Sequence, residues 1–183
     1  LEKDFGAVDR EKRTILSLYR NDIERFGAGD ATRVGRVFST IPGQRSKHDK
    51  VFRLSGIDRN ARMREYADAF FWLDSAQITS TCYNADDPSV GLSASLDDTT
   101  FKSYLSDTGL LVTQQFWDRD ETPNEVYRDI LLDKLEINEG MLVENAVAQQ
   151  LRAGGSRLFF YSRRDDDHRE NTMEIDFLIT RGY

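Results

Sequence analysis

The sequence has little cysteine, histidine or proline, and these shortages exclude several classes of protein. Its single cysteine, Cys82, rules out an internal disulfide, and two histidines without clustered cysteines give no zinc-binding spacing. No apolar run approaches the about 20 residues of a membrane span, and no secretory leader is recognisable. A P-loop of the pattern Gly-x4-Gly-Lys-Ser/Thr is also missing, so we expect no ATP site in this chain. These absences predict a cytoplasmic protein without a membrane segment.

Positive charge is scarce overall but concentrated in one segment. The formal net charge is −7, which argues against nucleic-acid binding by the whole surface, because phosphate affinity requires positive charge. Residues 30–64 nevertheless carry nine Lys or Arg against three Asp. This segment is therefore the candidate DNA-contacting part of the chain.

Apolar spacings of three and four predict helices in the first third of the sequence. One ends near Gly27, the next is stopped by Pro42-Gly43, and a third begins at Ser55, where Ser-x-x-Asp has the spacing of a capping box. β-branched residues then predict strands over 77–83 and 101–105. Three helices followed by a two-stranded ribbon is the layout of a winged helix.

Within that layout, the basic residues have expected roles. Arg59, Asn60 and Arg62 would lie in the first turns of the recognition helix and meet base edges, while Lys47 and Lys50 would face phosphates. The alternative is a solvated basic face that contacts acidic protein surface, because many winged helices join proteins. Both hypotheses remain open from the sequence.

The second half of the chain predicts a smaller α/β unit. Asp107-Thr-Gly begins a helix over 110–117, and the polar residues 118–124 mark a domain boundary. Helices are expected over 125–137 and 140–152, the latter closed by Gly154-Gly155, and strands over 158–161 and 173–180. We therefore predict an α+β protein with one module over 1–117 and another over 118–183.

Two carboxylates in this second unit are candidates for chemistry. Glu144 lies on the apolar stripe of its helix, where burial is costly unless the carboxylate is paired or binds a metal. Asp176 shares one strand face with Glu174, opposite an apolar row. The alternatives are a Glu that reaches water from the edge of the stripe and an acidic pair on the wet face of a sheet.

Several ordered motifs resemble the C-terminal region of prokaryotic AAA-type ATP-binding proteins, which ends in the domain of unknown function 4143. The stretches that carry the resemblance are Leu18-Tyr-Arg-Asn-Asp-Ile23, Phe38-Ser-Thr-Ile-Pro42, Ala61-Arg-Met-Arg-Glu-Tyr66, Lys102-Ser-Tyr-Leu-Ser-Asp-Thr-Gly-Leu110, Gly140-Met-Leu-Val-Glu-Asn145 and Glu174-Ile-Asp-Phe-Leu178. They cover nearly the whole chain.

This resemblance implies an ATPase module, then a winged-helix segment, then a domain similar to the PD-(D/E)XK nuclease fold. Glu144 would be the helix acid and Asp176 the strand acid of its catalytic Mg²⁺ site, which is completed by a Glu-x-Lys strand. The ATPase module and the Glu-x-Lys strand are not found in this sequence, so the nuclease-like domain is expected to be incomplete. We expect no DNA cleavage by this chain, and Mg²⁺ or ATP only in a complete protein.

Three functions follow as hypotheses. The leading one is a DNA-binding role through residues 30–64 in an AAA-type ATP-binding protein. The second is a non-enzymatic homo-oligomerisation or protein-interaction module, since an incomplete sheet offers an open edge. The third is an active Mg²⁺-dependent nuclease in the complete protein.

Overall fold

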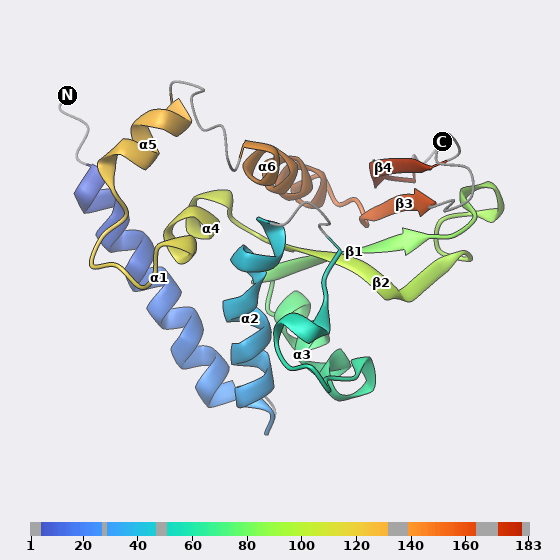
Figure 1. The fold of residues 1–183 in the computed structure, drawn as a ribbon, viewed down its shortest axis with the longest axis horizontal. Helices are drawn as coiled ribbons and strands as arrows, with labels where there is room; N and C mark the ends of the chain where they lie inside the picture. The colour runs from blue at the N-terminus through green and yellow to red at the C-terminus, as the bar shows by residue number, and fades with distance from the viewer. Residues whose placement is uncertain (1–4, 27–28, 47–50, 132–138, 164–171, 181–183) are drawn as a thin grey trace.

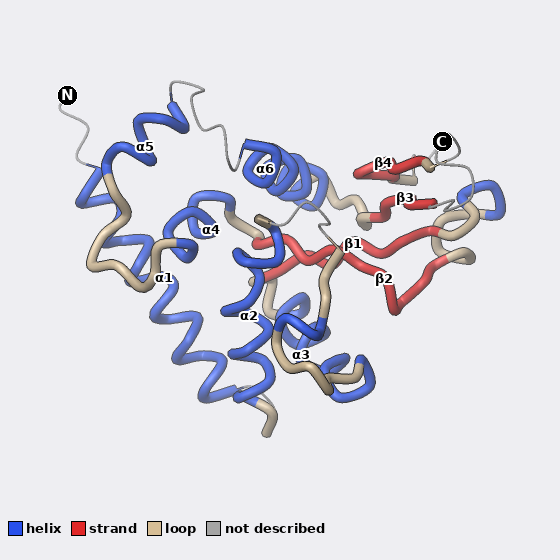
Figure 2. The backbone as a smooth tube through the Cα atoms, in the orientation of Figure 1, coloured by secondary structure: helices blue, strands red, loops and turns tan. Residues whose placement is uncertain are grey.

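A computed structural model describes residues 5–26, 29–46, 51–131, 139–163 and 172–180. It is an α+β structure, in which helices gather at one side and a four-stranded sheet at the other (Figure 2). The elements are α1 (Phe5–Phe26), α2 (Ala31–Arg45), η1 (Leu54–Gly56), α3 (Met63–Ser75), β1 (Thr79–Ala85), η2 (Pro88–Val90), β2 (Leu96–Leu105), α4 (Thr108–Gln115), α5 (Asn124–Leu131), α6 (Glu139–Ala153), β3 (Phe159–Arg163) and β4 (Met173–Leu178).

The sheet has the strand order β2-β1-β3-β4 and mixes two kinds of pairing. β1 pairs antiparallel with β2, and β3 pairs antiparallel with β4. The two hairpins meet where β1 and β3 run parallel, with Tyr83 opposite Phe159. The sheet therefore contains strands from both sides of residues 118–124, and the division into modules over 1–117 and 118–183 stays a prediction.

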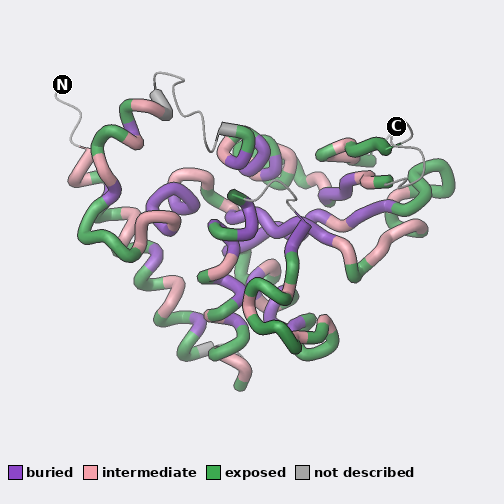
Figure 3. The backbone as a smooth tube through the Cα atoms, in the orientation of Figure 1, coloured by how far each residue is buried: buried purple, intermediate pink, exposed green. Residues whose placement is uncertain are grey.

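The sheet has helices on both faces, with α2 and α3 on one side and α6 on the other (Figure 1). Successive strand residues point to opposite faces. On β2, Phe101 and Leu105 join the core shared with α2 and α3, whereas Tyr104 joins a second core that includes Cys82 and Phe160. The purple stretches of β1 and β2 in Figure 3 mark this buried centre, while β4 is only half-buried or exposed. Burial on both faces makes β2 able to place polar side chains deep in the molecule.

The second helix continues through Pro42, which the sequence predicted to be its end. Proline has no N–H to donate to the carbonyl four residues earlier, here that of Phe38. Gln114 of α4 replaces the lost donor, because its Nε2 lies 2.9 Å from the Phe38 carbonyl oxygen. A contact from another element therefore overrides the local helix-stop signal.

The prediction that a helix begins at Ser55 is wrong. Residues 54–56 form a single 3₁₀ turn, and α3 begins at Met63. The Asp58 carboxylate accepts the Asn60 N–H at 2.8 Å, which is a local Asx turn rather than a helix cap. The sequence also predicts a short helical turn over 47–52, of which residues 47–50 lie outside the described residues.

The second half follows the predicted order of elements. Asp107 caps α4 by accepting the Leu110 N–H at 2.8 Å, and Gly155 ends α6 with a φ of +82°. The expected helix over 125–137 is described as α5 only as far as Leu131. Among the described residues, no helix combines the length and apolarity needed to cross a membrane. The cytoplasmic location stays a prediction.

Candidate functional site

Glu144 and Asp176, the two predicted acids, converge on one lysine. Lys102 Nζ lies 3.2 Å from Glu144 Oε1, 2.9 Å from Asp176 Oδ1 and 3.1 Å from Glu174 Oε1. The Lys102 side chain is 0% exposed, whereas those of Glu174 and Asp176 are 57% and 54% exposed. The ammonium is therefore buried beneath a carboxylate pair that also faces solvent.

Glu144 is buried, so it does not reach water from the edge of the apolar stripe. Its carboxylate contacts Lys102, Tyr104 and Arg45. Its Oε1 accepts the Tyr104 hydroxyl at 2.6 Å as well as the Lys102 ammonium. Its Oε2 lies 3.0 Å from Arg45 Nη2, and Arg45 stacks over the Tyr104 ring at 4.3 Å. We call this set of six residues the Lys102 cluster: Arg45, Lys102, Tyr104, Glu144, Glu174 and Asp176. The sequence left open whether a buried Glu144 is paired or binds a metal, and in the structure its carboxylate is paired with Lys102 and Arg45.

The electrostatics of the cluster favour a charged Lys102 and a neutral Tyr104. Burial opposes the charge on Lys102, yet Glu144 and Asp176 together raise its pKa above the ordinary value. Burial also raises the pKa of Tyr104 strongly, and the neighbouring Glu144 carboxylate acts in the same direction. Lys102 is therefore a permanent cation at neutral pH, and Tyr104 is a neutral hydrogen-bond donor.

Four elements supply the cluster, namely α2, β2, α6 and β4. Strand alternation places Lys102 and Tyr104 on the face of β2 that α6 covers. Asn145 fixes α6 against that strand, because its side-chain amide accepts from the Leu105 N–H at 3.0 Å and donates to the Leu105 carbonyl at 2.9 Å. Glu144, the preceding residue, is thereby held over Lys102.

In this arrangement the carboxylates do not fit a Mg²⁺ ion. Magnesium requires oxygen ligands in near-octahedral geometry. Here the oxygens of Glu144, Glu174 and Asp176 contact an ammonium, and Glu144 also contacts a guanidinium. Within the described part of the chain, no group of three or more His, Cys, Asp or Glu side chains is arranged to hold a metal. We therefore derive no reaction step through a metal ion.

Cys82 lies beside the cluster but is not a nucleophile. It is fully buried, and burial raises the pKa of its thiol to about 12. Because the reactive species of cysteine is the thiolate, this side chain is inert near neutral pH. It belongs to the core that also includes Tyr104 and Phe160.

The predicted nucleic-acid-binding residues do not lie on a recognition helix. Arg59, Asn60 and Arg62 are exposed in the turn that precedes α3, so their expected place in its first turns is wrong. The physical reason is the Asx turn at Asp58, which delays the helix. Lys47 and Lys50 lie outside the described residues.

The basic segment 30–64 is also divided between different environments. Arg45 is 1% exposed in the Lys102 cluster, and Arg33 pairs with Asp30 at 2.9 Å. Arg59, Arg62 and Arg64 are exposed and form no ion pair among the described residues. The available positive charge therefore lies mainly around the start of α3.

The sequence analysis missed Lys102, Arg45 and Tyr104. A signal was present in Phe101-Lys-Ser-Tyr-Leu105, a strand segment with apolar residues on both faces. Its lysine lies on the same face as the tyrosine two residues later. A lysine in such a place needs a buried acid. Pairing it with Glu144 from a distant helix would have required the fold.

Comparison with known families gives one result for this sequence. Residues 2–121 match a family profile described as a domain of unknown function (DUF8612). The chain belongs to the DUF8612 family. No curated protein and no solved structure matches it. The DUF8612 stretch supplies the cations of the cluster, Arg45 and Lys102, whereas Glu144, Glu174 and Asp176 come from beyond it.

Proposed function

We propose that this protein binds nucleic acid without cleaving it, as the C-terminal region of an AAA-type ATP-binding protein. The first part would act as a winged-helix-like module and the second as a nuclease-like scaffold. ATP binding would belong to an upstream module, and Mg²⁺ to a complete site that includes a Glu-x-Lys strand. The observation that carries the nucleic-acid role is the unpaired positive charge around the start of α3.

That charge is arranged for phosphate contact. Arg59, Arg62 and Arg64 lie exposed within six residues of one another, and none has a carboxylate partner in the described structure. Guanidinium groups bind phosphate through paired N–H donors and are weakly hydrated, so exposed arginines are the usual phosphate-contacting residues. On a chain with a net charge of −7, such a local surface is where a polyanion would approach.

The motifs that carry the resemblance meet in space, which supports the proposed lineage. Asn145 of Gly140–Asn145 donates to the Thr108 hydroxyl at 3.0 Å, and Thr108 belongs to the Asp-Thr-Gly motif. Glu144 and Asp176 both contact Lys102, which begins the stretch containing that motif. Motifs separated by up to 74 residues therefore share one site.

We expect no cleavage because the carboxylates of the cluster already contact cations of the same chain. Hydrolysis by such a site needs carboxylates free to bind a metal ion that activates water. Here three carboxylates are compensated by Lys102 and Arg45 from the DUF8612 stretch. The cluster supports a structural role in joining the two parts of the chain.

The test is DNA binding measured by fluorescence anisotropy over a range of salt concentrations. We expect binding that weakens with salt, and each lost phosphate contact should reduce the salt slope by about 1. Arg59→Ala combined with Arg62→Ala should reduce that slope by about 2. Binding that is absent at every salt concentration would exclude the proposal, and cleavage of the probe in Mg²⁺ would exclude its second half.

A second candidate function is protein interaction through α3. Phe71 on this helix is 73% exposed, and Asp68 and Arg64, three and seven residues earlier, are exposed on the same outward face. A large exposed aromatic side chain is typical of protein interfaces, and so is arginine beside it. This face therefore favours a protein partner or a second copy of the chain.

Light scattering distinguishes the second candidate. A homo-oligomer that dissociates on Phe71→Ser, with DNA binding unchanged, would support self-association through α3. A monomer at all concentrations would exclude self-association by this face.

A further inference from the structure

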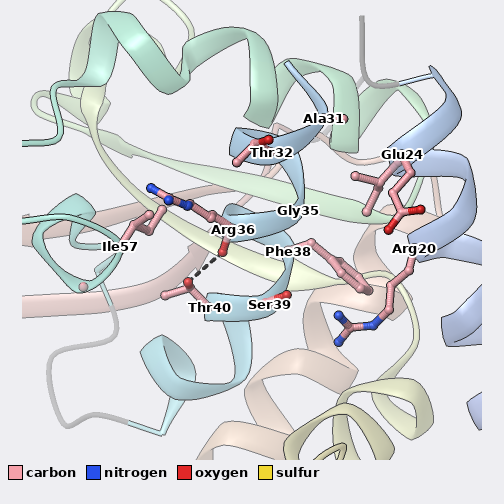
Figure 4. A pocket seen from close by; sticks show the side chains of 12 residues that line it. Arg20, Glu24, Ala31, Thr32, Gly35, Arg36, Phe38, Ser39, Thr40 and Ile57 are labelled. Carbon is pink, nitrogen blue, oxygen red and sulfur yellow. Dashed lines mark hydrogen bonds between the residues drawn. The ribbon is translucent and has the colours of Figure 1, made fainter. Parts of the chain in front are cut away.

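We propose that the groove between α1, α2 and the η1 turn binds a phosphate group of a nucleic-acid backbone. This inference rests on the proposed function and extends it to a second, separate contact. The groove has a volume of about 550 Å³ and is lined by residues of all three elements. Figure 4 shows Arg20 and Arg36 at opposite sides of it, with α2 between them.

Arg20 is held in place without a carboxylate. Its guanidinium lies 4.6 Å from the Trp117 ring and 5.7 Å from the Phe38 ring. Its Nε is buried and has no hydrogen-bond partner, and no acidic group of the described residues pairs with it. Burial lowers the pKa of Arg20. A rigid, uncompensated guanidinium is a preorganised site for an anion.

The exposed face of α2 forms the floor of the groove and allows a nucleic-acid backbone to approach closely. Ala31, Gly35 and Ser39 are small, and Thr32 and Ser39 carry hydroxyls that can donate to phosphate oxygens. Ala31 and Thr32 belong to the first turn of the 15-residue helix, whose positive end favours an anion. Asp30 does not cap this end with its side chain.

Arg36 connects the groove to the arginines around α3. Its side chain is exposed and has no ion pair in the described structure, while its backbone carbonyl accepts the Thr40 hydroxyl at 2.7 Å. Gly56 and Ile57 line the same groove and directly precede the turn that carries Arg59. The positive charge therefore continues from Arg20 across α2 to that turn, which suits an extended polyanion better than a single small ligand. Among the described residues of the lining, Glu24 is the one acidic side chain.

The sharpest test adds one negative charge inside the groove and compares it with the same charge outside. Gly35 lines the groove, and a Cβ there would meet only Ile23 Cγ2 at 3.8 Å, an ordinary contact. Gly43 is exposed on the same helix, does not line the groove, and has nothing within 4 Å of an added Cβ. Gly35→Glu and Gly43→Glu therefore add the same charge to the same helix, one inside the groove and one outside it.

We expect Gly35→Glu to weaken binding of a DNA duplex and of a single strand by about tenfold, and Gly43→Glu to leave it close to wild type. Arg36→Gln should reduce the salt slope by about 1. Circular dichroism and thermal melting of both glycine variants check that the fold is intact. A mononucleotide and inorganic phosphate serve as small-ligand probes in parallel.

The outcomes separate this inference from the proposed function. If Gly35→Glu binds DNA as well as Gly43→Glu does, the groove is not a phosphate site, and the role of Arg59 and Arg62 stands unaffected. If Gly35→Glu abolishes DNA binding while the Arg59→Ala, Arg62→Ala variant retains it, the groove is supported as a phosphate site and the DNA contact at the turn before α3 is not. Binding of the mononucleotide without binding of DNA would overturn the nucleic-acid assignment, as would failure of the wild-type protein to bind any probe.

Discussion

The Lys102 cluster and the Arg20–Arg36 groove differ in whether their cations are paired with carboxylates. In the cluster, every cation contacts a carboxylate of the same chain, and Glu144 alone contacts Lys102, Arg45 and Tyr104. In the groove, Arg20 packs between aromatic rings and Arg36 faces solvent, and neither has an acidic partner among the described residues. The cations of the cluster are therefore neutralised within the chain, whereas the arginines of the groove are available to bind an anion.

This difference indicates where stability and function reside. A buried ion pair costs free energy to assemble, but breaking it costs more, because the remaining charge is left uncompensated. Removing an exposed arginine changes stability little. Substitutions in the cluster should therefore affect folding, and substitutions in the groove should affect binding.

The largest effect should come from Lys102→Met, which removes the buried ammonium and keeps the side-chain length. Glu144 would remain buried with one cation fewer, and we expect a loss of about 3–5 kcal/mol in the free energy of unfolding, measured with urea. The half-exposed Glu174 and Asp176 should contribute little of it, because solvent screens them. A loss below about 1 kcal/mol would show that the cluster is not an essential part of the fold.

The double variant Lys102→Met, Glu144→Gln provides the control. It removes both charges of the Lys102–Glu144 pair, while the amide oxygen that replaces the carboxylate can still accept from Arg45, so it should be more stable than Lys102→Met alone. The pH dependence gives an independent check. Since the pKa of Lys102 is raised above 10.5, its contribution is complete below that pH and is lost as the pH rises further. Wild-type protein should therefore lose stability in this alkaline range, and Lys102→Met should lose less.

A second closed network, at Asp9, should give an intermediate effect. Its carboxylate accepts from Arg13 Nε at 2.8 Å, from the Thr122 N–H at 3.0 Å and from the Tyr127 hydroxyl at 2.7 Å. Although burial opposes ionisation, these donors hold the pKa of Asp9 well below its ordinary 3.8. Asp9→Asn should cost about 2 kcal/mol at neutral pH.

The sign of the pH dependence at Asp9 is opposite to that at Lys102. A lowered pKa contributes stability that is present above pH 3.8 and is lost as the pH falls through the folded-state value. The difference between wild type and Asp9→Asn should therefore shrink on acidification. Asp22→Asn, an exposed change on the same helix, should alter stability by less than about 0.5 kcal/mol. A constant difference down to pH 2 would mean that Asp9 acts by packing and not by charge.

The sequence predicted local features better than partnerships between distant residues. The Asp107 cap and the Gly155 helix end follow from local chemistry, and the structure contains both. The start of α3 and the continuation of α2 through Pro42 were predicted wrongly, since an Asx turn and a contact from Gln114 override the local signals. Periodicity predicts which residues are buried, but it does not identify the tertiary partners of a buried charge.

Gln114 tests such a tertiary override with a smaller effect. Gln114→Leu should leave the Phe38 carbonyl unpaired and cost about 1 kcal/mol in unfolding free energy. In a Pro42→Ala background the helix regains its own N–H donor, so the same change should cost clearly less. Equal costs in the two backgrounds would show that Gln114 stabilises α2 by packing alone. A double-mutant cycle in urea measures the difference.

The smallest effect on stability should come from Arg36→Gln, in the region where the charge has no partner. Arg36 is exposed, its side chain has no ion pair within the described structure, and the substitution keeps the contact between its backbone carbonyl and the Thr40 hydroxyl. We expect a change of less than about 0.5 kcal/mol in the free energy of unfolding. The same variant should lower the salt slope of DNA binding by about 1. A loss of stability above about 1 kcal/mol would mean that Arg36 supports the fold as Lys102 does, and the contrast between the groove and the cluster would fail, because stability and binding would then depend on the same charges.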